Sequence, residues 1–98
     1  MNNAIEFVTF TLKNGESVPD FLIASKKMND DFLTTQKGYI SRKLLSKDDM
    51  WADIVLWETM EDALYAAEVC NENDSAVEYF SFIENVDLFY HFSVEQNY

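Results

Sequence analysis

The stretch 50-MWADIVLWETMEDALYAAEVC-70 joins a predicted strand to a predicted helix and decides the fold class. Residues 50–57 are rich in aromatic and β-branched side chains, which is typical of a strand. Thr59 and the acidic residues after it then form a helix N-terminal capping pattern. The inner face of this helix carries only small side chains, namely Ala63, Ala66, Ala67 and Cys70. The helix therefore either packs very close to the sheet or leaves a space beneath it.

The remaining elements follow from the same two periodicities. The predicted strands cover residues 4–12, 39–45, 51–58 and 86–95. Ser17 caps a first helix that carries a proline in its first turn and ends near Gly38. The helix capped by Thr59 ends at about Asn71, and Asp74 caps a third, short helix.

This order of strand, helix, strand, strand, helix, strand predicts a ferredoxin-like α+β sandwich with a four-stranded antiparallel sheet. The 98 residues form a single domain, residues 1–98. Right-handed crossovers place both main helices on the same face of the sheet. The other face then has no cover from the chain itself.

Two-residue alternation along the strands predicts which side chains lie on each face. The face under the helices is expected to hold Val8, Phe10, Leu12, Ile40, Leu44, Ile54, Leu56, Leu88, Tyr90, Phe92 and Val94. The opposite face is expected to hold Ile5, Phe7, Tyr39, Leu45, Trp51, Val55, Trp57 and Phe89, with the polar Thr9, Ser41, Lys43, Asp53 and His91. Because this second face is more apolar than monomers usually expose, we expect a homodimer in which a second copy covers it.

Composition excludes several classes of partner. Eighteen acidic and seven basic residues give a formal charge of −11, which disfavours nucleic acid and anionic membrane surfaces. The single cysteine cannot form an internal disulfide, and the N-terminus lacks the pattern of a signal peptide. We therefore expect a cytoplasmic protein without a transmembrane span.

The chain resembles the dimeric α+β barrel superfamily, and within it the antibiotic-biosynthesis monooxygenase-like proteins. The resemblance lies in 10-FTLKNGES-17, 36-QKGYISRKLL-45 and 53-DIVLWETMEDALYAA-67, and it spans nearly the whole chain. It implies two sheets packed face to face in a dimer and a small-molecule pocket between the helices and the sheet. It also implies activities such as cofactor-free oxygenation of phenolic polyketides and quinols, haem breakdown or lactone isomerisation.

The resemblance argues against haem breakdown. The haem-degrading branch needs an asparagine, a tryptophan and a histidine at positions that hold Val8, Ala66 and roughly Ala76 here. The polyketide branch uses Trp, Tyr, Asn and Arg around a phenolic substrate, and that activity stays open. We expect no cofactor.

His91 is the only histidine and the main candidate for proton transfer near neutral pH. Strand alternation places it on one face with Asp53 and Thr9, which would orient the imidazole. The alternative is a hydrogen-bonded structural histidine in the subunit interface.

Two further candidates are Arg42 and Cys70. Arg42 falls on the helix-facing side with Glu6, where its planar fork would bind a carboxylate or phenolate; the alternative is a salt bridge at the rim. Cys70 has no basic neighbour in sequence and is expected to be a buried structural thiol. The acidic pairs are explained by helix surfaces, a loop and a helix N-terminus, so no metal site is expected.

Two functions remain open. The first is a pocket for an apolar or aromatic small molecule, such as a fatty-acyl, quinone or polyphenol-like ligand, in a candidate cofactor-independent monooxygenase. Its candidate ligand-binding residues are Trp57, Tyr65, Ala66, Tyr90, Phe92 and Arg42. The second is a dimeric interaction module without a ligand, in which the alanines only allow the helix to pack close to the sheet.

Overall fold

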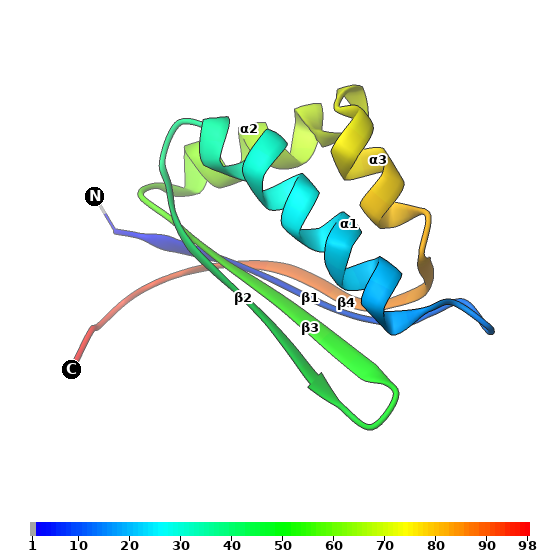
Figure 1. Cartoon of the computed structure of the whole chain (residues 1–98). Coiled ribbons are helices and arrows are strands. Elements are labelled where there is room, and N and C mark those ends of the chain that lie inside the picture. Colours follow the sequence, from blue (N-terminus) through cyan, green and yellow to red (C-terminus); the bar gives the residue numbers. More distant parts are fainter. Residues whose placement is uncertain (1) are drawn as a thin grey trace.

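The computed structural model describes residues 2–98, which form one antiparallel sheet covered by helices on one face (Figure 1). The strands are β1 (Ala4–Leu12), β2 (Tyr39–Lys47), β3 (Met50–Trp57) and β4 (Ile83–Ser93), in the order β2-β3-β1-β4. The helices are α1 (Val18–Asp31), α2 (Met60–Val69) and α3 (Asp74–Phe80), with the 3₁₀ turns η1 (Leu33–Thr35) and η2 (Cys70–Glu72). The predicted ferredoxin-like α+β fold is confirmed.

Local capping explains where the helices begin. The backbone N–H of Asp20 donates to Ser17 Oγ at 3.3 Å, and the backbone N–H of Asp62 donates to Thr59 Oγ1 at 3.1 Å. The third helix is capped by Asn73 and not by Asp74, because the side chain of Asn73 accepts the N–H of Ala76. The first helix also ends earlier than predicted: the backbone leaves helical geometry at Phe32, and η1 follows.

The predicted faces of β3 are reversed. Strand β1 pairs with β3 so that Val8 lies opposite Asp53 and Ala4 lies opposite Trp57. Because cross-strand partners project to the same face, Asp53, Val55 and Trp57 lie under the helices, where Trp57 is fully buried. Side chains on both faces of β3 are apolar, so alternation alone could not decide between the two orientations.

Strand β4 is reversed as well. A bulge between Thr9 and Phe10 shifts its register, so that Val8 pairs with Phe89 and Phe10 with Val86. As a result Phe89 and His91 share the helix-covered face. Tyr90 and Phe92, which alternation placed under the helices, lie on the open face.

Tyr39 on β2 also lies on the face opposite to the predicted one. A register irregularity separates Tyr39 from Ser41 in the pairing of β2 with β3. The Tyr39 ring contacts the Trp57 ring edge to face at 6.1 Å, and its hydroxyl lies 3.4 Å from Asn29 Oδ1 on α1. Tyr39 therefore belongs to the covered side of the sheet, as does Leu44, which was predicted there.

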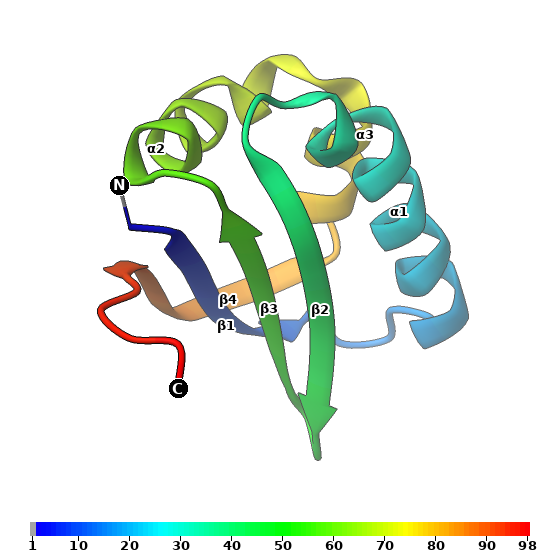
Figure 2. The same cartoon turned by 90° about the vertical axis from the view of Figure 1, so that its left-hand side faces the viewer.

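The helices leave one face of the sheet open (Figure 2). This open face is apolar, as predicted, although its residues differ from those expected. Tyr90 and Phe92 are 51% and 52% exposed. Strand pairing places the following apolar side chains on this face: Ile5, Phe7, Leu45, Ile54, Leu56, Leu88, Tyr90 and Phe92. The open face does not include Trp51, Val55 or Trp57, which lie under the helices. The prediction that these three residues form part of the dimer interface is therefore wrong.

The core between the helices and the sheet is aromatic. The Phe21 ring on α1 stacks on Tyr79 of α3 at 5.2 Å and meets the edges of Trp51 at 5.0 Å and Phe10 at 6.0 Å. These contacts fix α1 and α3 on the sheet. No helix within residues 2–98 is long and apolar enough to cross a membrane.

Candidate functional site

A cavity of about 370 Å³ lies between the sheet and the helix layer. This volume falls within the range of about 300 to 1,000 Å³ that is common for small-molecule sites. Its walls are mainly apolar and come from the helical segments above it and from β1, β3 and β4. The lining residues are Glu6, Val8, Phe10, Met28, Phe32, Leu33, Asp53, Val55, Trp57, Ala66, Ala67, Cys70, Tyr79, Phe80, Ile83, Glu84, Val86 and Phe89.

The small residues of α2 serve both of the purposes that the sequence left open. Ala66 and Ala67 line the cavity, and their short side chains leave the space beneath the C-terminal half of the helix. Ala63 is fully buried and does not line it, so the first half of the helix packs directly on the core.

Glu6 supplies an ionisable group in the cavity wall. Its side chain is 18% exposed and projects from β1 among apolar neighbours. Burial, and then the negative charge of Asp53, raise the pKa of Glu6 to about 7, although Arg42 partly offsets this shift. A carboxyl group with such a pKa exchanges its proton near neutral pH, which is typical of groups that act as acids or bases.

His91 is the direct partner of Glu6. The two residues lie opposite each other on β4 and β1, and His91 Nε2 is 3.3 Å from Glu6 Oε1. Burial lowers the pKa of His91. Of the predicted row of His91, Asp53 and Thr9, the first two do share one face of the sheet. Thr9 projects to the opposite, open face, and Asp53 pairs with Arg42 instead of with His91.

Asp53, Arg42 and Tyr79 form a closed network beside the cavity. Arg42 Nε and Nη2 donate to Asp53 Oδ1 and Oδ2 at 2.9 and 2.8 Å, and Arg42 Nη1 donates to the Ser25 carbonyl at 3.1 Å. The Tyr79 hydroxyl donates to Asp53 Oδ2 at 2.7 Å. Burial, and then the charge of Asp53, raise the pKa of Tyr79, so this hydroxyl stays protonated. Each of the three guanidinium nitrogens of Arg42 donates to a protein acceptor, and Arg42 does not line the cavity.

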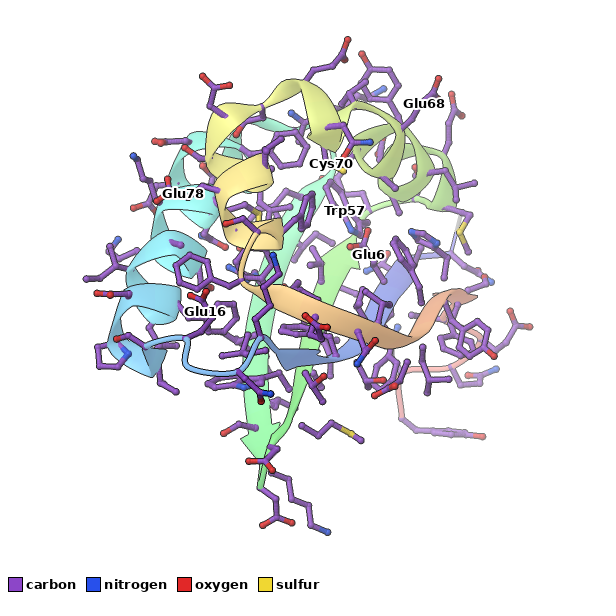
Figure 3. The ribbon with its side chains drawn as sticks, turned by 90° about the vertical axis from the view of Figure 1, so that its right-hand side faces the viewer. Glu6, Glu16, Trp57, Glu68, Cys70 and Glu78 are labelled. Atoms are coloured by element: carbon purple, nitrogen blue, oxygen red, sulfur yellow. The ribbon has the colours of Figure 1, made fainter. Side chains whose placement is uncertain are left out.

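Trp57 lines the cavity and carries a buried hydrogen-bond donor without a protein partner. Within residues 2–98, its Nε1 is the buried side-chain nitrogen that has no acceptor, and the residue is 0% exposed. A buried donor left unpaired costs about 1 to 3 kcal/mol, so such groups usually meet water or a ligand. Figure 3 shows Trp57, Glu6 and Cys70 between the sheet and the helices, and all three residues line the cavity.

Cys70, the first residue of η2, also lines the cavity. Burial, and then the charge of Glu6, raise the pKa of its thiol, so Cys70 remains protonated. Its Sγ lies 3.2 Å from the Ala67 carbonyl. The thiol is half-buried and not in the core proper.

Only some of the predicted ligand-binding residues meet at the cavity. Trp57 and Ala66 line it. Tyr65 is 60% exposed on the outer side of α2, and Tyr90 and Phe92 lie on the open face, so these three side chains are placed elsewhere. Glu6 was not identified from the sequence as an acid or base. It is the single carboxylate in the apolar strand 4-AIEFVTFTL-12 and lies on its helix-facing side, and this pattern could have indicated a functional group.

Solved structures share this fold across nearly the entire chain. SnoaB from Streptomyces nogalater, a cofactor-independent oxygenase solved as its N63A mutant, matches with a TM-score of 0.79 at 14% identity, over 99% of this chain and 97% of that one. A candidate antibiotic biosynthesis monooxygenase from Chloroflexus aurantiacus matches with a TM-score of 0.69 at 9% identity, over 98% and 96%. A dimeric ferredoxin-like protein from an uncultured marine organism matches with a TM-score of 0.67 at 9% identity, over 100% and 92%.

Comparison at the level of sequence adds no relative. No family model matches the chain, and no curated protein matches it. The identities to the solved structures are low, so the likeness concerns the fold. The chain has the ferredoxin-like fold of these solved structures, which include antibiotic biosynthesis monooxygenase-like proteins.

Proposed function

We propose that the cavity binds a neutral aromatic small molecule of the quinone or polyphenol type, and that the protein oxygenates it without a cofactor. The observation that carries this proposal is the composition of the cavity wall. It combines an apolar, aromatic lining with the unpaired indole N–H of Trp57 and a carboxyl group that titrates at about 7. The Trp57 N–H suits a carbonyl or phenolic oxygen of the ligand.

The charges around the cavity favour a neutral aromatic ligand over a fatty acid. Glu6 and Asp53 are both carboxyl groups in the wall, and the guanidinium of Arg42 is already bound to Asp53. The carboxylate of a fatty acid would meet like charge and no free cation among these groups. Flat ring systems also match walls formed by Phe32, Trp57 and Phe89.

Oxygenation without a cofactor requires that the substrate itself supply the electrons. For an acidic ring methylene, the balanced reaction is CH₂ plus O₂ giving C=O plus H₂O, in which the carbon is oxidised and O₂ is reduced. The protein's part is to bind the molecule, exclude water and remove a proton. The activity named for SnoaB, a cofactor-independent oxygenase with the same fold, supports this choice.

The proposal includes a homodimer formed through the open face of the sheet. No helix within residues 2–98 covers the eight apolar side chains of that face. Four of them are more than 40% exposed, namely Leu45, Leu88, Tyr90 and Phe92. Burying apolar surface contributes about 25 cal/mol per Å². The dimeric ferredoxin-like neighbour supports this arrangement.

Binding is tested with anthrone, an aromatic ketone that has one carbonyl acceptor and one acidic ring methylene. The proposal predicts saturable binding of one anthrone per chain in anaerobic calorimetry, and oxygen-dependent conversion to the quinone when air is admitted. Denaturing extraction followed by mass spectrometry tests for an aromatic compound that co-purifies. If anthrone does not bind and extracts repeatedly contain no such compound, the protein is instead a dimeric module without a ligand.

A further inference from the structure

We infer that Glu6 and His91 form a proton-transfer pair, in which Glu6 takes a proton from the molecule in the cavity and His91 carries it to solvent. The inference rests on the proposed function, because the first step needs a bound molecule. The pairing of the two side chains does not depend on any ligand and is testable without one.

The positions of the two residues define a path from the cavity outwards. Glu6 lies on β1, an inner strand, and lines the cavity. His91 lies on β4, which is an edge strand, and does not line the cavity. The 3.3 Å contact between Nε2 and Oε1 connects them, and the His91 side chain is 15% exposed. The imidazole therefore lies between the carboxyl group and the outer edge of the sheet.

The other charged groups near Glu6 are not suited to relay its proton. Asp53 on β3 and Arg42 on β2 are bound to each other, and their charges act on Glu6 in opposite directions. The thiol of Cys70 on η2 is held protonated by burial and by Glu6 itself. His91 is thus the neighbour that can exchange a proton with Glu6 near neutral pH.

Burial shifts the proton affinities of both partners. It raises the pKa of Glu6 to about 7 and lowers that of His91 from its ordinary value of 6.5. Because Nε2 and Oε1 are in contact, the two groups hold and release their protons as a coupled unit.

The step is an acid–base reaction without oxidation or reduction. An acidic C–H or O–H bond of the bound molecule breaks, and its electron pair stays on the molecule. The proton forms an O–H bond on Glu6 and then moves to Nε2 of His91, which releases its Nδ1 proton to water. Glu6 is the group that contacts the molecule, and His91 acts through Glu6.

The first experiment measures exchange of the ring methylene protons of anthrone with D₂O, under anaerobic conditions and followed by NMR. Wild-type protein is expected to accelerate exchange, and Glu6→Gln to lower the accelerated rate by about 100-fold or more. His91→Gln keeps a polar side chain that does not titrate, and its rate is expected to fall between the two. Asp87→Asn removes an exposed carboxylate from β4 and should exchange like the wild type. Equal rates in wild type and His91→Gln would overturn the relay.

The second experiment needs no ligand, because the chain has a single histidine. The ¹⁵N signals of His91 are followed against pH in the wild type and in Glu6→Gln, with the amide spectrum of each variant confirming its fold. We expect the wild-type curve to carry two coupled steps, and Glu6→Gln to lose one and shift the other to lower pH, because the imidazolium loses its anionic partner. Identical curves would overturn the pair. Coupled curves together with absent anthrone binding would instead contradict the proposed function and leave the pair in place.

Discussion

The imidazole of His91 lies 3.3 Å from the carboxyl group of Glu6, although the two residues are 85 positions apart in the chain. The antiparallel pairing of β1 with β4 brings them together, and the bulge after Thr9 sets the register that does so. The same register turns Phe89 towards the cavity and Tyr90 away from it. This one irregularity in the pairing of β1 with β4 thus determines both the Glu6–His91 contact and the composition of the open face.

Glu6 makes the stability of the fold depend on pH. Its pKa is about 7 in the folded protein, against an ordinary value of 4.5 in the unfolded chain, so the folded state binds more protons between these values. Stability therefore falls as pH rises from 4.5 to 7, by about 2 to 3 kcal/mol from this group. The lowered pKa of His91 acts in the opposite direction, because protonation of His91 below its ordinary pKa disfavours the folded state.

Urea unfolding at several pH values, in the wild type and Glu6→Gln, isolates the contribution of Glu6. As pH rises from 4.5 to 7, the free energy of unfolding of the wild type should fall relative to that of Glu6→Gln, so that the variant gains relative stability at high pH. Asp87→Asn serves as the control for loss of one carboxylate. A difference that is constant with pH would mean that Glu6 is not buried as described.

Asp53 is expected to be essential for stability. Its carboxylate balances the guanidinium of Arg42, and the two side chains are only 10% and 6% exposed. Asp53→Ala leaves this cation buried and unpaired, which costs about 3 to 5 kcal/mol in denaturant unfolding. Lys26→Ala breaks the exposed pair with Asp30 and should leave the unfolding midpoint unchanged. Similar midpoints for Asp53→Ala and Lys26→Ala would contradict the network.

Trp57 is expected to hold the ligand by its indole N–H. Trp57→Phe keeps an aromatic ring in the wall and removes the unpaired donor. Loss of one hydrogen bond of about 1.4 kcal/mol weakens binding about tenfold, which calorimetry with anthrone would measure. The matched control is Trp51→Phe, because Trp51 packs on Phe21 and does not line the cavity. If Trp57→Phe binds anthrone with unchanged affinity, the indole N–H does not contact the ligand.

The open face of the sheet predicts how the chain associates. Phe7 lies opposite Ile54 and Tyr90, near the middle of that face. Phe7→Asp is expected to convert a dimer of twice the chain mass into a monomer in light scattering, because it places a charge in an apolar interface. Tyr65→Asp changes an exposed aromatic on α2 and should leave the dimer intact. A monomeric wild type at micromolar concentration would contradict the dimer.

The order of the elements was predictable because it depends on local signals. Ser17 and Thr59 cap their helices through contacts three residues away, and such contacts are visible in sequence. The assignment of faces was not predictable for β3 and β4, since both carry apolar side chains on each face. His91 was recognised as a candidate from the sequence. Its pairing with Glu6 depends on a bulge in the β1–β4 pairing, and no residue type in these strands predicts that bulge.

The space beneath Ala66 is the proposed binding site, and calorimetry of the wild type and Ala66→Phe with anthrone is the sharpest check of it. Ala66 is buried and lines the cavity, so a phenyl ring there takes the volume of the ligand. The control is Leu64→Phe on the exposed side of α2. Ala66→Phe is expected to lose binding and keep its thermal midpoint, while Leu64→Phe should bind anthrone like the wild type. A sharp loss of stability in Ala66→Phe, of about 1 to 3 kcal/mol, together with a wild type that binds nothing, would show that the core is filled and holds no binding site.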